Sequence, residues 1–99
     1  MMMTTALVQA LLTLKTDAEY EKVWRDLLTP QEIRVMEERW RIAQMLDQGE
    51  KSYREIAAET GASVTTVGRV ARFLRDEPYQ GYRMLLDRTA KQKSKKAKK

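Results

Sequence analysis

Residues 52–74 read SYREIAAETGASVTTVGRVARFL, the pattern of two short helices joined by a glycine-marked turn. Ser52 and Glu55 have the spacing of a capping box at the start of the first helix. Gly61 can adopt the left-handed backbone conformation that ends a helix, and Ser63 can cap the helix that follows. These local signals predict a helix-turn-helix over about residues 52–75.

The second of these helices has two chemically different faces. Its apolar face consists of Val64, Val67, Ala71 and Leu74. This spacing predicts packing against the first helix. The opposite face carries Thr65, Arg69 and Arg72, a small hydroxyl side chain and two long cations that can reach guanine edges or phosphates, so we expect it to enter a DNA major groove. The alternative is an ordinary helical bundle with solvated arginines. In that case the short turn and the absence of acidic residues from Gly61 to Arg75 would be coincidences.

Length and composition limit the chain to one modest domain. A chain of 99 residues buries a small core unless it associates with another chain. It has no cysteine and no histidine, which excludes thiolate chemistry, disulfides and the usual zinc sites, so we expect no metal and no cofactor. No stretch approaches the roughly eighteen apolar residues of a membrane-spanning helix. The apolar N-terminal run lacks a basic leader, so we expect a cytoplasmic, nucleoid-associated protein with no membrane contact.

The net charge of +5 arises at the end of the chain. Six of the 19 basic residues are lysines in the last nine positions, which leaves 13 basic against 14 acidic residues, or −1, for residues 1–90. Such a run is typical of a disordered segment and can add sequence-independent attraction to phosphate, although a solubilising end is an equal interpretation. We expect a folded domain over residues 1–89 and a disordered lysine-rich tail over residues 90–99.

The sequence around the motif predicts four further helices and no strand. An apolar run after Thr4 or Thr5 predicts a first helix to about residue 14, and a second helix follows residue 17. Thr29–Pro30, a capping hydroxyl before a proline, starts a third and longest helix that ends at Gly49. A last helix covers residues 79–89. The two ends carry more apolar surface than a monomer could easily hide, so we infer a homodimer whose reading helices lie roughly 34 Å apart, one duplex turn.

A longer pattern surrounds the motif. It includes Leu-Thr-Pro at residues 28–30, Arg39 and Arg41 on the long helix, Gly49, and Glu-x-Gly-Ala-Ser at residues 59–63. This pattern, over about residues 27–86, resembles the tryptophan repressor superfamily, and more closely its YerC/YecD-type members. The resemblance implies an intertwined six-helix, all-α homodimer that binds a palindromic operator in double-stranded DNA as a transcriptional repressor.

The resemblance also implies a corepressor pocket between the long helix and the reading helix. Arg39 and Arg69 match the two arginines that hold the corepressor amino acid. Val70 and Phe73 replace a glycine and a serine, so their larger side chains should fill the space of the indole. The resulting vestigial pocket comprises Leu28, Thr29, Arg39, Arg69, Val70 and Phe73. We expect no tryptophan corepressor, which leaves Arg69 for DNA and Arg39 for a carboxylate or a phosphate.

Motif and resemblance together give a set of candidate DNA contacts. They are Tyr53, Arg54, Ser63, Thr65, Thr66, Gly68, Arg69 and Arg72. At two DNA-facing positions the chain departs from the repressor, because Ala57 replaces a lysine and Gly68 replaces a threonine. The operator should therefore differ from that of the repressor. Arg54 and the lysine tail are expected on phosphates.

Two other classes of function fit the sequence less well. A helix-turn-helix can serve protein or RNA interaction, but no aromatic platform for stacking single-stranded bases is displayed here. An enzyme without histidine or cysteine would depend on carboxylates, lysine or tyrosine, and the acidic clusters have the spacing of solvated helix surfaces. The sequence has no glycine-rich phosphate loop and no metal-ligand spacing. We expect a DNA-binding regulator, not an enzyme.

Overall fold

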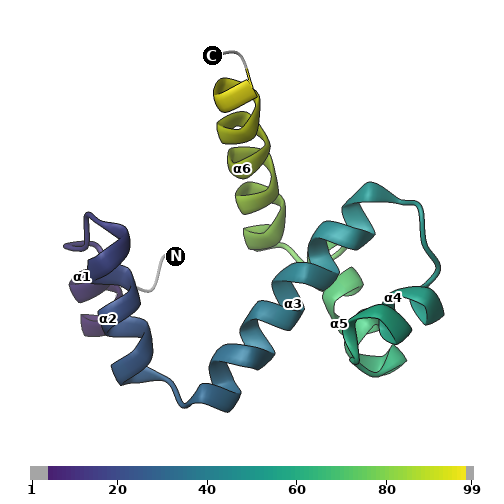
Figure 1. Ribbon diagram of the computed structural model, residues 1–99, viewed down its shortest axis with the longest axis horizontal. Coiled ribbons are helices and arrows are strands. Elements are labelled where there is room, and N and C mark those ends of the chain that lie inside the picture. Colours follow the sequence, from purple (N-terminus) through teal and green to yellow (C-terminus); the bar gives the residue numbers. More distant parts are fainter. Residues whose placement is uncertain (1–4, 98–99) are drawn as a thin grey trace. The chain divides into compact units, whose positions relative to one another are not determined.

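The computed structural model describes residues 5–97, which form six α-helices and no strand (Figure 1). The helices are α1 (Ala6–Leu11), α2 (Asp17–Leu27), α3 (Pro30–Gln48), α4 (Tyr53–Thr60), α5 (Val64–Arg75) and α6 (Gly81–Ala97). The all-helical prediction is confirmed. The chain divides into two compact units, residues 1–34 and residues 35–99. Within the described part, no helix combines the length and the apolar character needed to cross a membrane.

The first unit holds α1, α2 and the start of α3. The Thr5 hydroxyl caps α1 by accepting a hydrogen bond from the backbone N–H of Val8 (3.1 Å), and Thr16 and Glu19 form a reciprocal capping box at α2. No residue of α1 or α2 is buried. The large apolar side chains left exposed are Leu7, Val8, Leu12, Tyr20, Trp24 and Leu27. Trp24 has the helical spacing of a core residue in the sequence, but within this chain 37% of its surface is exposed.

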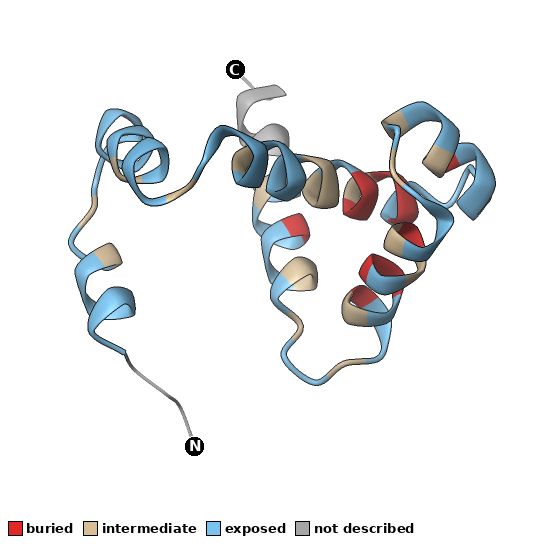
Figure 2. Cartoon of the chain, turned by 90° about the horizontal axis from the view of Figure 1, so that it is seen from below, coloured by how far each residue is buried: buried red, intermediate tan, exposed pale blue. Residues whose placement is uncertain are grey.

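The second unit holds the core, which the C-terminal half of α3 forms with α4, α5 and α6 (Figure 2). Its buried side chains are Ile42, Ala43, Met45, Leu46, Ile56, Val67, Val70, Ala71, Leu74 and Leu86. Those from α3 and α5 recur at steps of three and four residues, which places each set on one helix face. The core is small, as the length of the chain predicts.

The buried face of α5 differs from the predicted face. Val67, Ala71 and Leu74 are buried as predicted, but Val64 is 48% exposed and Val70 is fully buried. Val64 is the first residue of α5, and helical side chains lean toward the N-terminal end of their helix. Its side chain therefore projects beyond the packed part of the helix. Val64 is for this reason not part of the buried face of α5, although its spacing predicted that it packs against the first helix of the motif.

The connection between α4 and α5 has the predicted conformation. The backbone N–H of Ser52 donates to Glu55 Oε1 (2.8 Å), and that of Glu55 donates to Ser52 Oγ (3.2 Å). The hydrogen bond from the Ser52 backbone lowers the pKa of the Glu55 carboxyl. Gly61 ends α4 with φ of +81°, and Ser63 caps α5. Because a Cβ at Gly61 would meet no atom within 4 Å, the backbone conformation and not the available space requires glycine.

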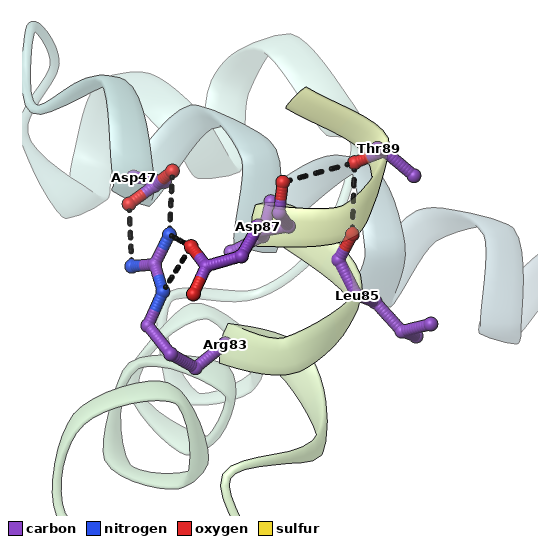
Figure 3. A network of polar contacts seen from close by, with 6 residues as sticks. Asp47, Arg83, Leu85, Asp87 and Thr89 are labelled. Carbon is purple, nitrogen blue, oxygen red and sulfur yellow. Dashed lines mark hydrogen bonds and ion pairs between the residues drawn. The ribbon is translucent and has the colours of Figure 1, made fainter. Parts of the chain in front are cut away.

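One arginine ties α6 to α3 (Figure 3). Arg83 donates to both carboxylate oxygens of Asp47, at 2.8 and 3.2 Å, and to Asp87 on α6 at 3.1 Å. The Arg83 hydrogen bonds lower the pKa of Asp47, and the two carboxylates raise the pKa of Arg83. A lowered carboxyl pKa stabilises the fold at pH values above the ordinary pKa, and this contribution is lost as the pH falls through the lowered pKa of Asp47.

α6 is longer than the sequence analysis predicted. It begins at Gly81, directly after Gln80, which has φ of +56°, and it extends to Ala97 and not to Thr89. Lysine, glutamine and alanine are good helix formers, so the helix continues into residues 90–97, which were expected to be disordered. The prediction of disorder rested on the run of lysine charges and gave no weight to the helix propensity of the same residues.

Candidate nucleic-acid interface

α4 and α5 pack together in the second unit, with the turn of residues 61–63 between them (Figure 1). Ile56 of α4 and Val67 of α5 are both fully buried in the core. Burial of these two side chains fixes the inner faces of both helices. The other face of α5 is left exposed to solvent.

The exposed edge of α5 carries Thr65, Arg69 and Arg72, which are spaced at i, i+4 and i+7. All three side chains are exposed. Arg72 Nε lies 3.5 Å from Glu77 Oε2, so part of its charge is balanced within the chain. Among the described residues no carboxylate lies within ion-pair distance of Arg69. The charge of Arg69 is therefore available to an external anion.

Phe73 contacts both arginines of this edge. Its ring centroid lies 4.5 Å from the guanidinium carbon of Arg69 and 5.1 Å from that of Arg72. Both distances are within the range of a cation–π interaction. From the sequence, Phe73 was predicted only as a member of the vestigial pocket, and this contact was not predicted. The i, i+4 spacing of Arg69 and Phe73 was the available signal.

Tyr53 and Arg54 form the start of α4, and both are exposed. Arg75 Nη1, at the end of α5, lies 3.5 Å from the Tyr53 hydroxyl oxygen, the outer limit of a hydrogen bond. The last residue of α5 thus meets the first residue of α4. Arg75 was not among the predicted site residues, because no local pattern connects positions 22 residues apart.

Two of the predicted contacts use their hydroxyl groups within the chain. Ser63 Oγ accepts a hydrogen bond from the backbone N–H of Thr66 (3.0 Å) and lies 3.0 Å from Thr66 Oγ1. These two residues therefore build the start of α5.

Gly68 is half-buried, and a Cβ at this position would meet no atom within 4 Å. Packing within the chain does not require glycine at position 68.

The residues of the predicted vestigial pocket fall in both units. In the first unit, Leu28 lines an open cleft of about 280 Å³, and the Thr29 hydroxyl caps α3. In the second unit, Val70 is fully buried and Phe73 is half-buried. Arg39 Nε is buried and has no hydrogen-bond partner among the described residues. Of the two partners expected for Arg39, a carboxylate or a phosphate, no carboxylate lies within ion-pair distance among those residues.

Comparison with known proteins identifies the family. The chain matches the family described as Trp repressor protein over residues 3–90. It is 39% identical over 82 residues to a Bacillus subtilis relative described as uncharacterized protein YerC. This match covers 83% of this chain and 77% of the relative. The crystal structure of a TrpR-like protein from Eubacterium eligens has a TM-score of 0.76 and 36% identity, and the match covers 85% of this chain and 84% of that one. The chain belongs to the Trp repressor family, as its sequence pattern predicted.

Proposed function

We propose that this protein is a sequence-specific DNA-binding regulator, a repressor that binds a palindromic operator as a homodimer without tryptophan. The observation that carries the proposal is the arrangement of α5. Apolar side chains fix one face in the core, while Thr65, Arg69 and Arg72 are exposed on the other. A helix edge of this composition suits the major groove, which is about 12 Å wide. Family membership supports a regulator over an enzyme, and the proposed place of action is the cytoplasmic nucleoid.

Under this proposal α5 and α4 contact different parts of the DNA. Arg69 and Arg72 contact base edges, preferably guanine, whose two acceptors match the fork of a guanidinium. Tyr53 and Arg54 contact phosphates, since they occupy the N-terminal end of α4, where the helix dipole favours anions. The lysines of residues 91–99 add attraction that does not depend on sequence.

We propose a second copy of this chain as the partner of the exposed apolar surface of the first unit. α1 and α2 bury no residue, yet they carry Tyr20, Trp24 and Leu27 among other exposed apolar side chains. Covering such a surface is favourable by roughly 25 cal/mol per Å² of apolar area. A symmetric pair would present two copies of α5 to one side of a duplex, so the operator should have twofold symmetry.

Selection of bound sites from randomised duplex DNA tests the proposal. The expected product is a short palindrome with half-site centres about 10 base pairs apart. The matched control is the double variant Arg69→Ala and Arg72→Ala, which keeps the core and should enrich no palindrome. If the unaltered protein enriches no sequence, the DNA-binding proposal is wrong. An enriched site without twofold symmetry, or a monomer in sedimentation equilibrium at micromolar concentration, would refute the homodimer.

Gly68→Ala should separate stability from DNA binding. Alanine is about 1 kcal/mol more favourable than glycine inside a helix, and the structure leaves space for the added methyl group. The variant should therefore unfold at a higher urea concentration. A methyl group on the edge that approaches DNA should weaken binding of the selected duplex by about fivefold, or roughly 1 kcal/mol. Unchanged affinity in a fluorescence anisotropy titration would show that DNA does not approach Gly68 closely.

L-tryptophan is expected not to bind. Val70 has no exposed surface, and the Phe73 ring is covered by the guanidinium groups of Arg69 and Arg72. Calorimetric titration of the unaltered protein should give no saturable heat at ligand concentrations up to about 1 mM, far above the Kd of a micromolar site. The matched variant, Val70→Gly with Phe73→Ser, removes the two large side chains. Saturable micromolar binding to the unaltered protein would contradict the filled pocket.

A further inference from the structure

The Phe73 ring is the point where the two arginines of the α5 edge meet. The guanidinium carbon of Arg69 lies 4.5 Å from the ring centroid, and that of Arg72 lies 5.1 Å from it. Phe73 is half-buried, whereas both arginines are exposed. A phenylalanine side chain has only two rotatable torsions, so it is a stiff platform compared with an arginine side chain. One stiff ring therefore restrains two long side chains.

This arrangement leaves the arginines able to bind. Where a guanidinium stacks on a ring, its flat face meets the ring and its N–H donors point outward in the plane of the group. Those donors are the atoms that would contact a guanine edge or a phosphate. An arginine held before binding also loses less conformational entropy when the complex forms. A ring that holds the arginines in this way would lower the entropy cost of recognition without using the donors.

The two arginines differ in their remaining contacts. Arg72 Nε also lies 3.5 Å from Glu77 Oε2. Arg69 also contacts the Phe73 ring, but among the described residues it has no carboxylate within ion-pair distance. Any effect of the ring on recognition should therefore be larger through Arg69 than through Arg72.

We propose that Phe73 is a positioning residue for DNA recognition, which holds Arg69 and Arg72 in place on the α5 edge before DNA arrives. This inference rests on the proposed DNA-binding function. It assigns Phe73 a role beyond filling the space next to Val70, and it makes the ring, more than the bulk of the side chain, the property that matters.

The test compares variants with and without a ring. Phe73→Leu removes the ring and retains an apolar side chain, and Phe73→Met is a second ring-free variant in case the first folds poorly. Phe73→Tyr keeps the ring. Tyr79→Leu is the control for loss of an aromatic side chain elsewhere, because Tyr79 is 86% exposed. Each full-length variant is titrated with the duplex selected from the random pool, and its unfolding midpoint in urea is measured beside the titration.

Phe73→Leu should weaken binding of the duplex about threefold to tenfold, the effect expected when one or two long side chains must be ordered during binding instead of before it. Phe73→Tyr should restore the affinity, and Tyr79→Leu should not change it. In the background of Arg69→Ala and Arg72→Ala, titrated at low salt, the same Phe73→Leu change should have no further effect. In the free protein, NMR should show ring-current shifts of the Arg69 δ-methylene protons that disappear in Phe73→Leu.

Three results would overturn the inference in different ways. If Phe73→Leu weakens binding equally with and without the two arginines, the residue acts through the fold and not through them. If the unaltered protein binds no duplex, the proposed function itself is wrong, and the positioning role is lost with it even where the ring-current shifts are present. If Phe73→Leu leaves the affinity unchanged while Arg69→Ala lowers it, the proposed function stands and the positioning role is wrong.

Discussion

Ile42→Ala is expected to lower the free energy of unfolding by about 3 kcal/mol, within the range measured for isoleucine-to-alanine changes in protein cores. Ile42 has no exposed surface and belongs to the small cluster of buried residues from α3, α4, α5 and α6. A core of this size has few other side chains that could move into the cavity. Because a chain of this length has a modest stability, a loss of this size should leave part of the protein unfolded.

Urea unfolding followed by circular dichroism measures this effect. All variants should be compared at one protein concentration, since the stability of an oligomer depends on concentration. Ile42→Val removes a single methylene and should cost about 1 kcal/mol. Arg41→Ala changes the exposed neighbour on the same helix and should stay within about 0.5 kcal/mol of the unaltered protein. Equal effects of Ile42→Ala and Arg41→Ala would show that the core lies elsewhere.

Local signals in the sequence predicted the helices well. The capping box of Ser52 and Glu55, the left-handed Gly61 and the start of α3 at Pro30 each depend on residues within one helical turn. Such interactions are visible in the sequence because the partners are at fixed short spacings. The bounds of α4 and α5 follow from them. The order of all six helices was predicted from local signals of this kind.

Contacts between distant residues could not be predicted in the same way. Arg83 pairs with Asp47 across 36 positions, and helical periodicity identifies a face without naming its partner. Periodicity also predicted the same burial for Val64 as for the interior positions of α5. A residue at a helix end has fewer neighbours, so its side chain is less buried. The helical spacing of Trp24 is that of a core residue, but its exposure in this chain depends on what covers α2. These differences arise from tertiary packing and not from helix formation.

Arg69→Ala is expected to weaken binding of the selected duplex by about 1 to 3 kcal/mol, roughly fivefold to 150-fold. Arg72→Ala should have a smaller effect, because Glu77 already lies 3.5 Å from Arg72 Nε and competes for its charge. The two changes should not be additive, since both arginines contact the Phe73 ring. Arg88→Ala removes the same charge from an exposed position on α6 and serves as the control. Fluorescence anisotropy titrations over a range of salt concentrations measure each affinity.

The salt dependence separates the two ways in which Arg69 could bind DNA. A lost phosphate contact should reduce the slope of log affinity against log salt by about 0.9, and it should weaken all sequences alike. A lost base contact should leave most of the slope and reduce the preference for one base pair of the operator. Arg69→Lys keeps the charge but not the planar fork, so it should restore a phosphate contact and fail to restore a bidentate guanine contact. If Arg69→Ala and Arg88→Ala weaken binding equally, the α5 edge does not read DNA. The loss would then depend on the net charge of the protein and not on the position of the arginine.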